Sequence, residues 1–474
     1  MPLRGLPEFS AARCFGPGQH LKAGPHCVFQ GTCARSILFP AGLALQTCLA
    51  LQNWLSCTLK LSRNRPPTWP RTMIVAVPKE TYPGERRVAL VPAGVTELVK
   101  LDCQVKIESA AGIAAGFSDD AYREKGAEIV DDRGTLFETA DLLLMVRTPG
   151  ANPASGQADL DRLSERQTLV GTADPLGNPH AMQQLAERGT TLFALEMLPR
   201  ITRAQSMDVL SSMATIAGYK AVLLGAEHLP KIFPMLMTAA GTLTAAKVFV
   251  IGAGVAGLQA IASARRLGAV VQAYDVRVAV KEQIESLGAR FVEMELPAEN
   301  AEGEGGYAKQ LGEDFYQKQR DLMARVVAES DVVITTAAIP GKPSPRLITA
   351  EAVRGMSAGS VIVDLAAERG GNCELSQPDE IVNENGVMIL GPTNLASEVP
   401  THASQMYSRN LTNFVAVLTR EGSLQLNLDD EVVRETLVAY RGHVTSPTIR
   451  ELLGMEPLET LPEGSPPIDH LAEN

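Results

Sequence analysis

Cysteine and histidine are scarce in this sequence, and the scarcity of cysteine excludes two kinds of site. The chain has 474 residues but seven cysteines, and five of these precede Met73. The remaining two, Cys103 and Cys373, are too far apart in sequence to indicate a metal cluster or a disulfide framework. We therefore expect no metal site and a reducing, cytoplasmic setting.

Positive charge is also in short supply. Lys and Arg number 43 against 54 Asp and Glu, which gives a net charge of −11. A chain with this balance and no basic face lacks the electrostatic footprint of a nucleic-acid-binding protein, so nucleic acid is not an expected partner. The length exceeds what one hydrophobic core usually supports and predicts two or three domains.

Residues 1–72 differ from the rest, with eight Lys and Arg, a single Glu, both tryptophans and no helical or strand period. Three interpretations stay open: a targeting peptide, a membrane anchor at residues 36–55, which Pro40 interrupts, and a leader upstream of a true start at Met73. We favour the leader, and mass spectrometry of the native N-terminus tests this. No other stretch after Met73 is long and apolar enough to suggest a bilayer span.

From Met73 onward, short β-branched runs alternate with amphipathic stretches. Strands are predicted at 73–77, 105–108, 127–130, 142–146, 168–171 and 191–195, and in a second series at 247–251, 269–274, 331–337, 360–366 and 387–391. Helices are predicted at 92–101 and 180–189. This alternation predicts an α/β protein with two Rossmann-like, doubly wound parallel-sheet domains joined by long helices.

The domain limits follow from the two series. We assign 73–205 plus 400–455 to the first α/β domain, because a strong helical pattern after Pro400 returns the chain to it. Residues 206–399 form the second, Rossmann domain with its connecting helix. The Pro-rich, acidic tail at 456–474 is expected to be loose.

A glycine-rich turn follows the strand at 247–251. In G-x-G-x-x-G, Gly252 permits the tight turn, Gly254 lets the backbone approach a pyrophosphate, and Gly257 lets the helix pack on the strand. The next strand ends at Asp275, whose carboxylate can bind ribose hydroxyls and repels a 2′-phosphate, so NAD(H) is the expected cofactor. The predicted cofactor-binding residues are Gly252, Ala253, Gly254, Val255, Gly257, Asp275, Val276 and Arg277, where Arg277 could counter a phosphate or brace the loop.

Later strands add weaker candidates, and the histidines add none. Ala338, Ile339 and Leu365 follow strands at the sheet edge where open α/β folds bind ligands, although core packing explains them equally well. A dehydrogenase for alcohols, amines or hydroxy acids needs a group that moves a proton. The histidines after Met73 are His180, His228, His402, His443 and His470, and none follows a predicted strand.

Five stretches carry a resemblance to a known family. They are residues 78–122, 200–222, 252–277, 305–310 and 364–372. The first resembles the N-terminal block shared by alanine dehydrogenases and the NAD(H)-binding domain of proton-translocating NAD(P) transhydrogenases, and the others are similar to the transhydrogenase branch. The resemblance covers nearly all of 73–455.

The resemblance also separates the two branches. It implies that alanine dehydrogenases carry a substrate-binding Lys where this chain has Arg147, and a catalytic His near the position of Ala173 and Asp174. This chain has neither, so it lacks the groups that amino-acid oxidation requires. Hydride transfer between two nicotinamides moves no proton at the reacting carbons, and the missing groups therefore fit transhydrogenation.

By the same resemblance, several residues receive roles. Arg200, Gln205, Asp208 and Ser211 match the constellation that orients the dihydronicotinamide in transhydrogenases, although Asp208 and Ser211 could also cap a helix. Gly305, Gly306 and Tyr307 match a loop that closes over NAD(H) and excludes water.

The resemblance implies hydride transfer from NADH to NADP⁺ held by a partner subunit, coupled to proton translocation. It implies a homodimer that works with membrane-embedded and NADP(H)-binding transhydrogenase subunits, at the inner face of the cytoplasmic membrane. Two alternatives stay open: an alanine dehydrogenase-like amino-acid oxidoreductase and a non-catalytic NADH-binding subunit.

Overall fold

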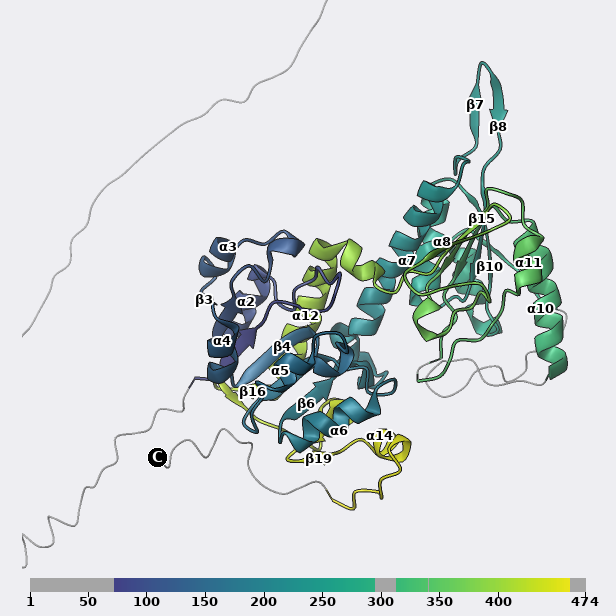
Figure 1. Cartoon of the computed structure of the whole chain (residues 1–474). Helices are drawn as coiled ribbons and strands as arrows, with labels where there is room; N and C mark the ends of the chain where they lie inside the picture. Colours follow the sequence, from purple (N-terminus) through teal and green to yellow (C-terminus); the bar gives the residue numbers. More distant parts are fainter. Residues whose placement is uncertain (1–71, 295–312, 340, 461–474) are drawn as a thin grey trace, which may run out of the picture. The chain divides into compact units, whose positions relative to one another are not determined.

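A computed structural model describes residues 72–294, 313–339 and 341–460, which lie within one compact unit (Figure 1). The expectations for residues 1–71, for Gly305, Gly306 and Tyr307, and for the tail beyond 460 fall outside the described residues. The described residues form two open α/β sheets, which confirms the predicted fold class.

The first sheet has eight strands in the order β19-β18-β6-β5-β4-β1-β2-β3. Its strands are β1 (Ile74–Val77), β2 (Gln104–Glu108), β3 (Glu128–Val130), β4 (Leu142–Arg147), β5 (Thr168–Thr172), β6 (Thr191–Ala194), β18 (Leu437–Tyr440) and β19 (His443–Val444). Strands β1 to β6 run parallel, whereas β18 pairs antiparallel with β6 and β19 with β18.

Helices cover both faces of this sheet because its strands are apolar on both faces. Val75 and Val77 of β1 pack in one core with Tyr407 of α12 (Pro400–Leu418), whereas Ala76 packs in the opposite core with Met182 of α6 (Pro179–Glu187). The other helices around this sheet are α2 (Pro92–Val99), α3 (Asp119–Arg123), α4 (Arg133–Thr139), α5 (Gln157–Leu160), α13 (Glu431–Thr436) and α14 (Pro447–Leu452).

The second sheet has seven strands in the order β11-β10-β9-β12-β13-β15-β14. They are β9 (Lys247–Ile251), β10 (Val270–Tyr274), β11 (Arg290–Phe291), β12 (Val332–Thr335), β13 (Val361–Asp364), β14 (Ile381–Glu384) and β15 (Val387–Leu390). Its helices are α8 (Val255–Arg266), α9 (Lys281–Ser286), α10 (Glu313–Ala328) and α11 (Ala350–Arg354). Every segment predicted as a strand contains one. The antiparallel edge strands β14, β18 and β19 were not predicted.

Helix α7 (Val209–His228) corrects one expectation. Its 20 residues, with a mean hydropathy of 1.4, meet the length and composition of a membrane span, so the expectation that no stretch after Met73 does so was wrong. In the structure α7 packs against α8, β12 and β13 of the second sheet and against α12 of the first. Its apolar composition therefore has partners within the protein. Only 28% of its most apolar window is buried, however, and some of the helix surface stays exposed.

A β-hairpin follows α7 and was also missed from sequence. Strands β7 (Leu236–Thr238) and β8 (Gly241–Leu243) pair antiparallel and project beyond α7 and α8 (Figure 1). All six residues of the two strands are exposed, and Met237 is 80% exposed. An isolated two-stranded hairpin is marginally stable in water, so this one is a candidate contact surface.

Candidate dinucleotide-binding site

The turn after β9 carries three glycines, and each has a different steric reason. Gly252 has a φ of 95°, in the left-handed region that favours glycine. A Cβ on Gly257 would lie 1.8 Å from the carbonyl oxygen of Gly252, so another residue would force α8 away from the strand. A Cβ on Gly254, the N-cap of α8, would meet no atom within 4 Å. The turn is therefore closely packed at Gly257 and open at Gly254, where a pyrophosphate can approach the helix N-terminus.

Asp275 directly follows β10 and binds the glycine turn. Its Oδ2 accepts a hydrogen bond from Ala253 N at 2.7 Å, and its Oδ1 accepts one from Arg277 N at 2.9 Å. The Arg277 guanidinium pairs with the same carboxylate, with Nε 2.9 Å from Oδ1 and Nη2 2.8 Å from Oδ2. Arg277 is thus engaged with Asp275, and the carboxylate links two neighbouring strands at their carboxyl ends. Val276, between them, is half-buried.

The turns after β12 and β13 continue the same edge of the sheet. Thr336 Oγ1 donates to the Gly252 carbonyl at 3.0 Å, which ties the turn after β12 to the glycine turn. The fully buried Asn372 exchanges hydrogen bonds with both backbone groups of Ala337, at 3.0 and 2.8 Å. Ala338 is exposed, and Ile339 is half-buried.

Asp364 shapes the loop after β13. Its carboxylate accepts from Thr335 Oγ1 at 2.8 Å and from the backbone N–H groups of Ala366 and Cys373 at 3.0 Å each. Leu365 is half-buried, and its N–H donates to the Thr335 carbonyl. The sequence analysis missed Asn372 and Asp364. Polar residues at the end of a predicted strand were the available signal for Asp364.

The start of α7 holds the second predicted constellation. Asp208 is the N-cap of α7: its Oδ1 accepts from Ser211 N at 2.9 Å, and its Oδ2 accepts from the Ser211 hydroxyl. Capping, which the sequence left as an alternative, is therefore present for this pair. Arg200, just before the short 3-10 helix η4 (Thr202–Met207), and Gln205 within it are both exposed.

Neighbouring elements anchor this loop. Asn410 and Asn413 of α12 both donate to the Ser206 carbonyl, at 2.9 and 3.0 Å, and Arg203 forms an ion pair with Asp430. The backbone of η4 is thus held from one side while Gln205 stays exposed to solvent. Such positioned loop residues are a common form of binding site.

The two constellations lie on packed helices. Residues 252–257, 275–277 and 336–339 share one sheet edge, whereas 200–211 lies at the beginning of α7. Helix α7 meets α8 where a Cβ on Gly218 would lie 2.1 Å from the Ala256 carbonyl oxygen. Ten residues separate Gly218 from Asp208, or about 15 Å along a helix. A ligand that touches both groups is therefore extended.

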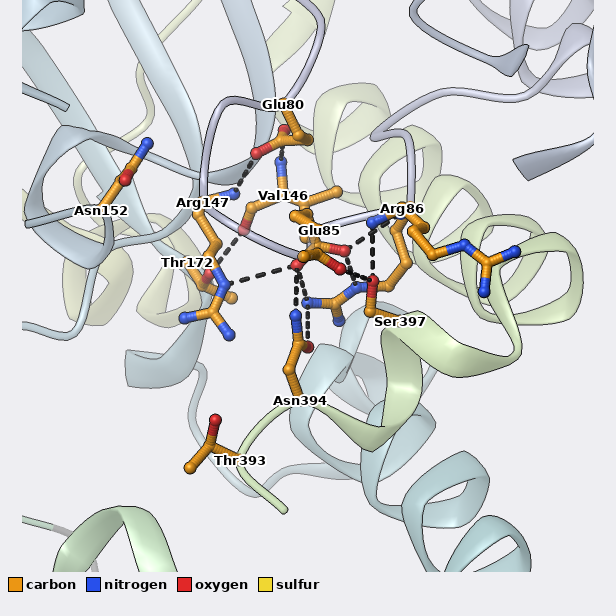
Figure 2. A network of polar contacts seen from close by, with 12 residues as sticks. Glu80, Glu85, Arg86, Val146, Arg147, Asn152, Thr172, Thr393, Asn394 and Ser397 are labelled. Carbon is orange, nitrogen blue, oxygen red and sulfur yellow. Dashed lines mark hydrogen bonds and ion pairs between the residues drawn. The ribbon is translucent and has the colours of Figure 1, made fainter. Parts of the chain in front are cut away.

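A second polar network lies at the carboxyl ends of β1 and β4 (Figure 2). Glu85 and Arg87, in the loop after β1, form a bidentate pair with both N–O distances 2.7 Å. The Glu85 Oε2 atom also accepts from Asn394 Nδ2 at 3.1 Å and from Arg147 Nε at 3.4 Å. Burial opposes ionisation of Glu85, but the hydrogen bonds and charge of Arg87 lower its pKa to about 2. The sequence analysis missed this network, because "GERR" looks like a solvated loop.

Glu80 adds a second buried carboxyl to this network. It accepts hydrogen bonds from Val146 N at 2.6 Å and Arg147 N at 3.2 Å, at the end of β4. Burial, together with the nearby charge of Glu85, raises the pKa of Glu80 to about 8. The carboxyl group therefore holds a proton near neutral pH.

The end of β5 carries the positions at which a proton-transferring side chain was sought. Ala173 is fully buried, and Asp174 forms an ion pair with Arg369, from the loop after β13. Glu196 Oε1 accepts from the backbone N–H groups of both Ala173 and Asp174, at 2.7 and 2.8 Å, and burial raises the pKa of Glu196 to about 7. The described histidines lie elsewhere: His180 in α6, His228 at the end of α7, His402 in α12 and His443 in β19. Within the described ranges, no group of His, Cys, Asp and Glu could hold a metal ion.

Together these features define an α/β protein of two open sheets, the second of which carries the turn of a dinucleotide-binding fold. Comparison with known proteins gives the family. The alanine dehydrogenase/PNT N-terminal domain matches residues 76–217, and the C-terminal domain of the same family matches 221–447. The chain belongs to the alanine dehydrogenase/PNT family.

Individual relatives favour one branch of this family. An NAD(P) transhydrogenase alpha subunit of Rhodospirillum rubrum is 46% identical over 380 residues, which cover 80% of this chain and 99% of the relative. An alanine dehydrogenase of Halomonas elongata is 31% identical over 395 residues, 82% of this chain and 98% of the relative. The crystal structure of a transhydrogenase from Sinorhizobium meliloti matches with a TM-score of 0.69 and 44% identity, over 78% of this chain and 99% of that one.

Proposed function

We propose that this chain is the NAD(H)-binding subunit of a proton-translocating NAD(P) transhydrogenase, and that it presents NADH for hydride transfer to NADP⁺ on a partner subunit. The observation that carries the proposal is the glycine turn, open at Gly254 and bordered by Asp275, in a chain 46% identical to a transhydrogenase alpha subunit. The strand order supports the placement, because β9 and β12 flank the point where the winding of the second sheet reverses.

The residues present fit NAD(H). The N-terminus of α8 and the backbone at Gly254 bind the pyrophosphate, and Asp275 accepts hydrogen bonds from the adenosine ribose. Arg277 is paired with Asp275 and is not available to a 2′-phosphate, so NADH is preferred over NADPH. Ala338, Ile339 and Leu365 border the other half of the dinucleotide. The bound nicotinamide supplies the hydride, and the protein supplies position and electrostatics.

No described side chain at the end of β5 takes the role of a general base. Ala173 offers no proton acceptor, and Asp174 is engaged with Arg369. This arrangement supports transfer between two nicotinamides, which needs no proton at the reacting carbons, over oxidation of an amino acid.

Arg200, Gln205, Asp208 and Ser211 orient the dihydronicotinamide. Asp208 fixes Ser211 through the cap of α7, and this pair sets the direction of the exposed polar groups on η4. Gly305, Gly306 and Tyr307 close over the bound cofactor and exclude water. None of these residues acts as an acid or base in this scheme.

The partners follow from the half-reaction that this chain performs. NADP(H) is held by a second subunit, and proton translocation is carried out by membrane-embedded subunits. This chain docks on them from the cytoplasmic side, at the inner face of the cytoplasmic membrane. It works as a homodimer.

Exposed apolar surface on α7 and on the β7–β8 hairpin supports the homodimer. A helix that is apolar on all sides is normally buried, yet Leu210 and Tyr219 of α7 are exposed, as are Met235 and Met237 at the hairpin. A second copy can cover the same surface symmetrically. Met237→Asp should dissociate the dimer in sedimentation velocity, while Ile381→Asp, at an exposed apolar residue of β14, should not. The reverse result would remove the hairpin from the interface.

Hydride transfer tests the proposal directly. The subunit is mixed with its NADP(H)-binding partner, and oxidation of NADH by a nicotinamide analogue is followed with and without that partner. Analogue reduction that requires the partner supports the proposal. Oxidation of alanine with NAD⁺ would instead identify an amino-acid dehydrogenase, and inertness in both assays would identify a non-catalytic NADH-binding subunit.

A further inference from the structure

The first sheet has its own crevice of the kind that binds ligands. In the order β6-β5-β4-β1-β2-β3, the winding reverses between β1 and β4, and ligands of open α/β sheets bind outside the carboxyl ends of strands at such a reversal. Arg87 follows β1, and Arg147 ends β4 at this point. The described glycine turn belongs to the other sheet, so this crevice has no role in the function proposed above.

One carboxylate occupies the centre of the crevice, and it belongs to the chain itself. The Glu85 side chain is 0% exposed. It accepts from Arg87 Nε, Nη2 and the Arg87 backbone N–H at 2.7, 2.7 and 3.0 Å, and from Asn394 Nδ2 and Arg147 Nε at 3.1 and 3.4 Å. Two guanidinium groups and an amide that converge on one carboxylate form the donor set that recognises a free carboxylate ion.

Arg147 has donor capacity beyond what Glu85 uses. Its Nε bonds Glu85, and its guanidinium lies 4.1 Å from the centre of the Tyr82 ring. Within the described residues its two terminal nitrogens make no hydrogen bond, and Figure 2 shows them pointing away from Glu85. The side chain is 16% exposed, so Arg147 lies at the mouth of the crevice and Arg87 lies deeper.

We propose that Arg87, Arg147 and Asn394 form a binding site for a small monocarboxylate, and that Glu85 occupies this site as a ligand built into the chain. Glu85 thereby determines specificity: it keeps free carboxylate substrates out of the first sheet. A purely structural ion pair differs in one respect, because a free ion of the same chemistry does not replace its missing member.

Glu85→Ala tests this, because the atoms that it removes are those of an acetate ion. Sodium acetate should raise the melting temperature of Glu85→Ala by about 3–6 °C relative to sodium chloride at equal ionic strength. Wild type and Glu85→Gln, in which a side chain of full length fills the site, should show no difference between the two salts. Addition of Arg147→Met to Glu85→Ala should weaken acetate binding, measured by calorimetry, about tenfold.

Two results would overturn the proposal. One is a folded Glu85→Ala protein that binds NADH like wild type but melts at the same temperature in acetate, formate and chloride. The other is an equal effect of phosphate, which would show a general anion effect. If Glu85→Ala does not fold in chloride, refolding yields are compared: recovery in acetate supports the site, and equal yields in both salts contradict it. NADH binding is measured separately, so failure here leaves the proposed function unaffected.

Discussion

Replacing Asp275 with alanine should weaken NADH binding and relax the choice between NADH and NADPH. In the proposed complex the carboxylate accepts from the ribose, and hydrogen bonds to a charged group contribute about 1.5–3 kcal/mol. A loss of about 2–3 kcal/mol corresponds to a rise in the NADH dissociation constant of about 30- to 150-fold. The same change frees Arg277, now paired with Asp275, to face a 2′-phosphate, so NADPH binding should tighten.

The assay is titration of reduced-nicotinamide fluorescence with each dinucleotide. Asp331→Ala is the matched control, because Asp331 is an ion-paired aspartate at the opposite edge of the same sheet. It bonds Lys231 Nζ and Lys247 N, both at 2.8 Å. An Asp275→Ala protein with the NADH affinity of wild type would refute the reasoning. Equal losses in Asp275→Ala and Asp331→Ala would point to a general disturbance of the sheet.

Three further predictions test individual residues. Asp208→Asn keeps a cap acceptor for Ser211, so hydride transfer should fall about tenfold or more while the NADH dissociation constant changes little; equal losses would contradict an orienting role. Gly254→Ala should leave the melting temperature nearly unchanged and weaken NADH binding, whereas Gly257→Ala, with its Cβ 1.8 Å from a carbonyl oxygen, should cost about 1–3 kcal/mol of stability, as measured by urea unfolding. Burial raises the pKa of Glu80 from 4.5 to about 8, so the folded state binds this proton more tightly and stability should decline as pH rises from about 5 to about 8.5; Glu80→Gln, which cannot titrate, should show a smaller decline, and an identical pH profile would remove Glu80 as a cause.

The features of the fold that sequence predicted are those with local causes. A strand buried on both faces is a continuous apolar run, so β9 and β13 could be located from their own residues. The glycine turn is equally local: Gly252 and Gly257 meet each other within one strand–turn–helix unit, and this geometry requires glycine.

The features that sequence missed depend on residues far apart in the chain. Glu85 and Asn394 are separated by 309 positions, and nothing near either residue indicates the other. Arg86 N and Ser397 Oγ, 311 positions apart, bond at 2.6 Å in the same region. Asp208 is an intermediate case, because its cap was foreseen as an alternative, while its relation to a bound nicotinamide stays a prediction.

The strand order of the first sheet has a consequence for synthesis of the protein. Strand β18 pairs with β6, although the whole second sheet lies between them in the chain. While the ribosome makes those residues, β6 is an unpaired edge, and unpaired edges promote aggregation. We therefore expect the second sheet to mature first during translation, and premature termination before Leu437 to yield an insoluble product even though every residue of the glycine turn has been made.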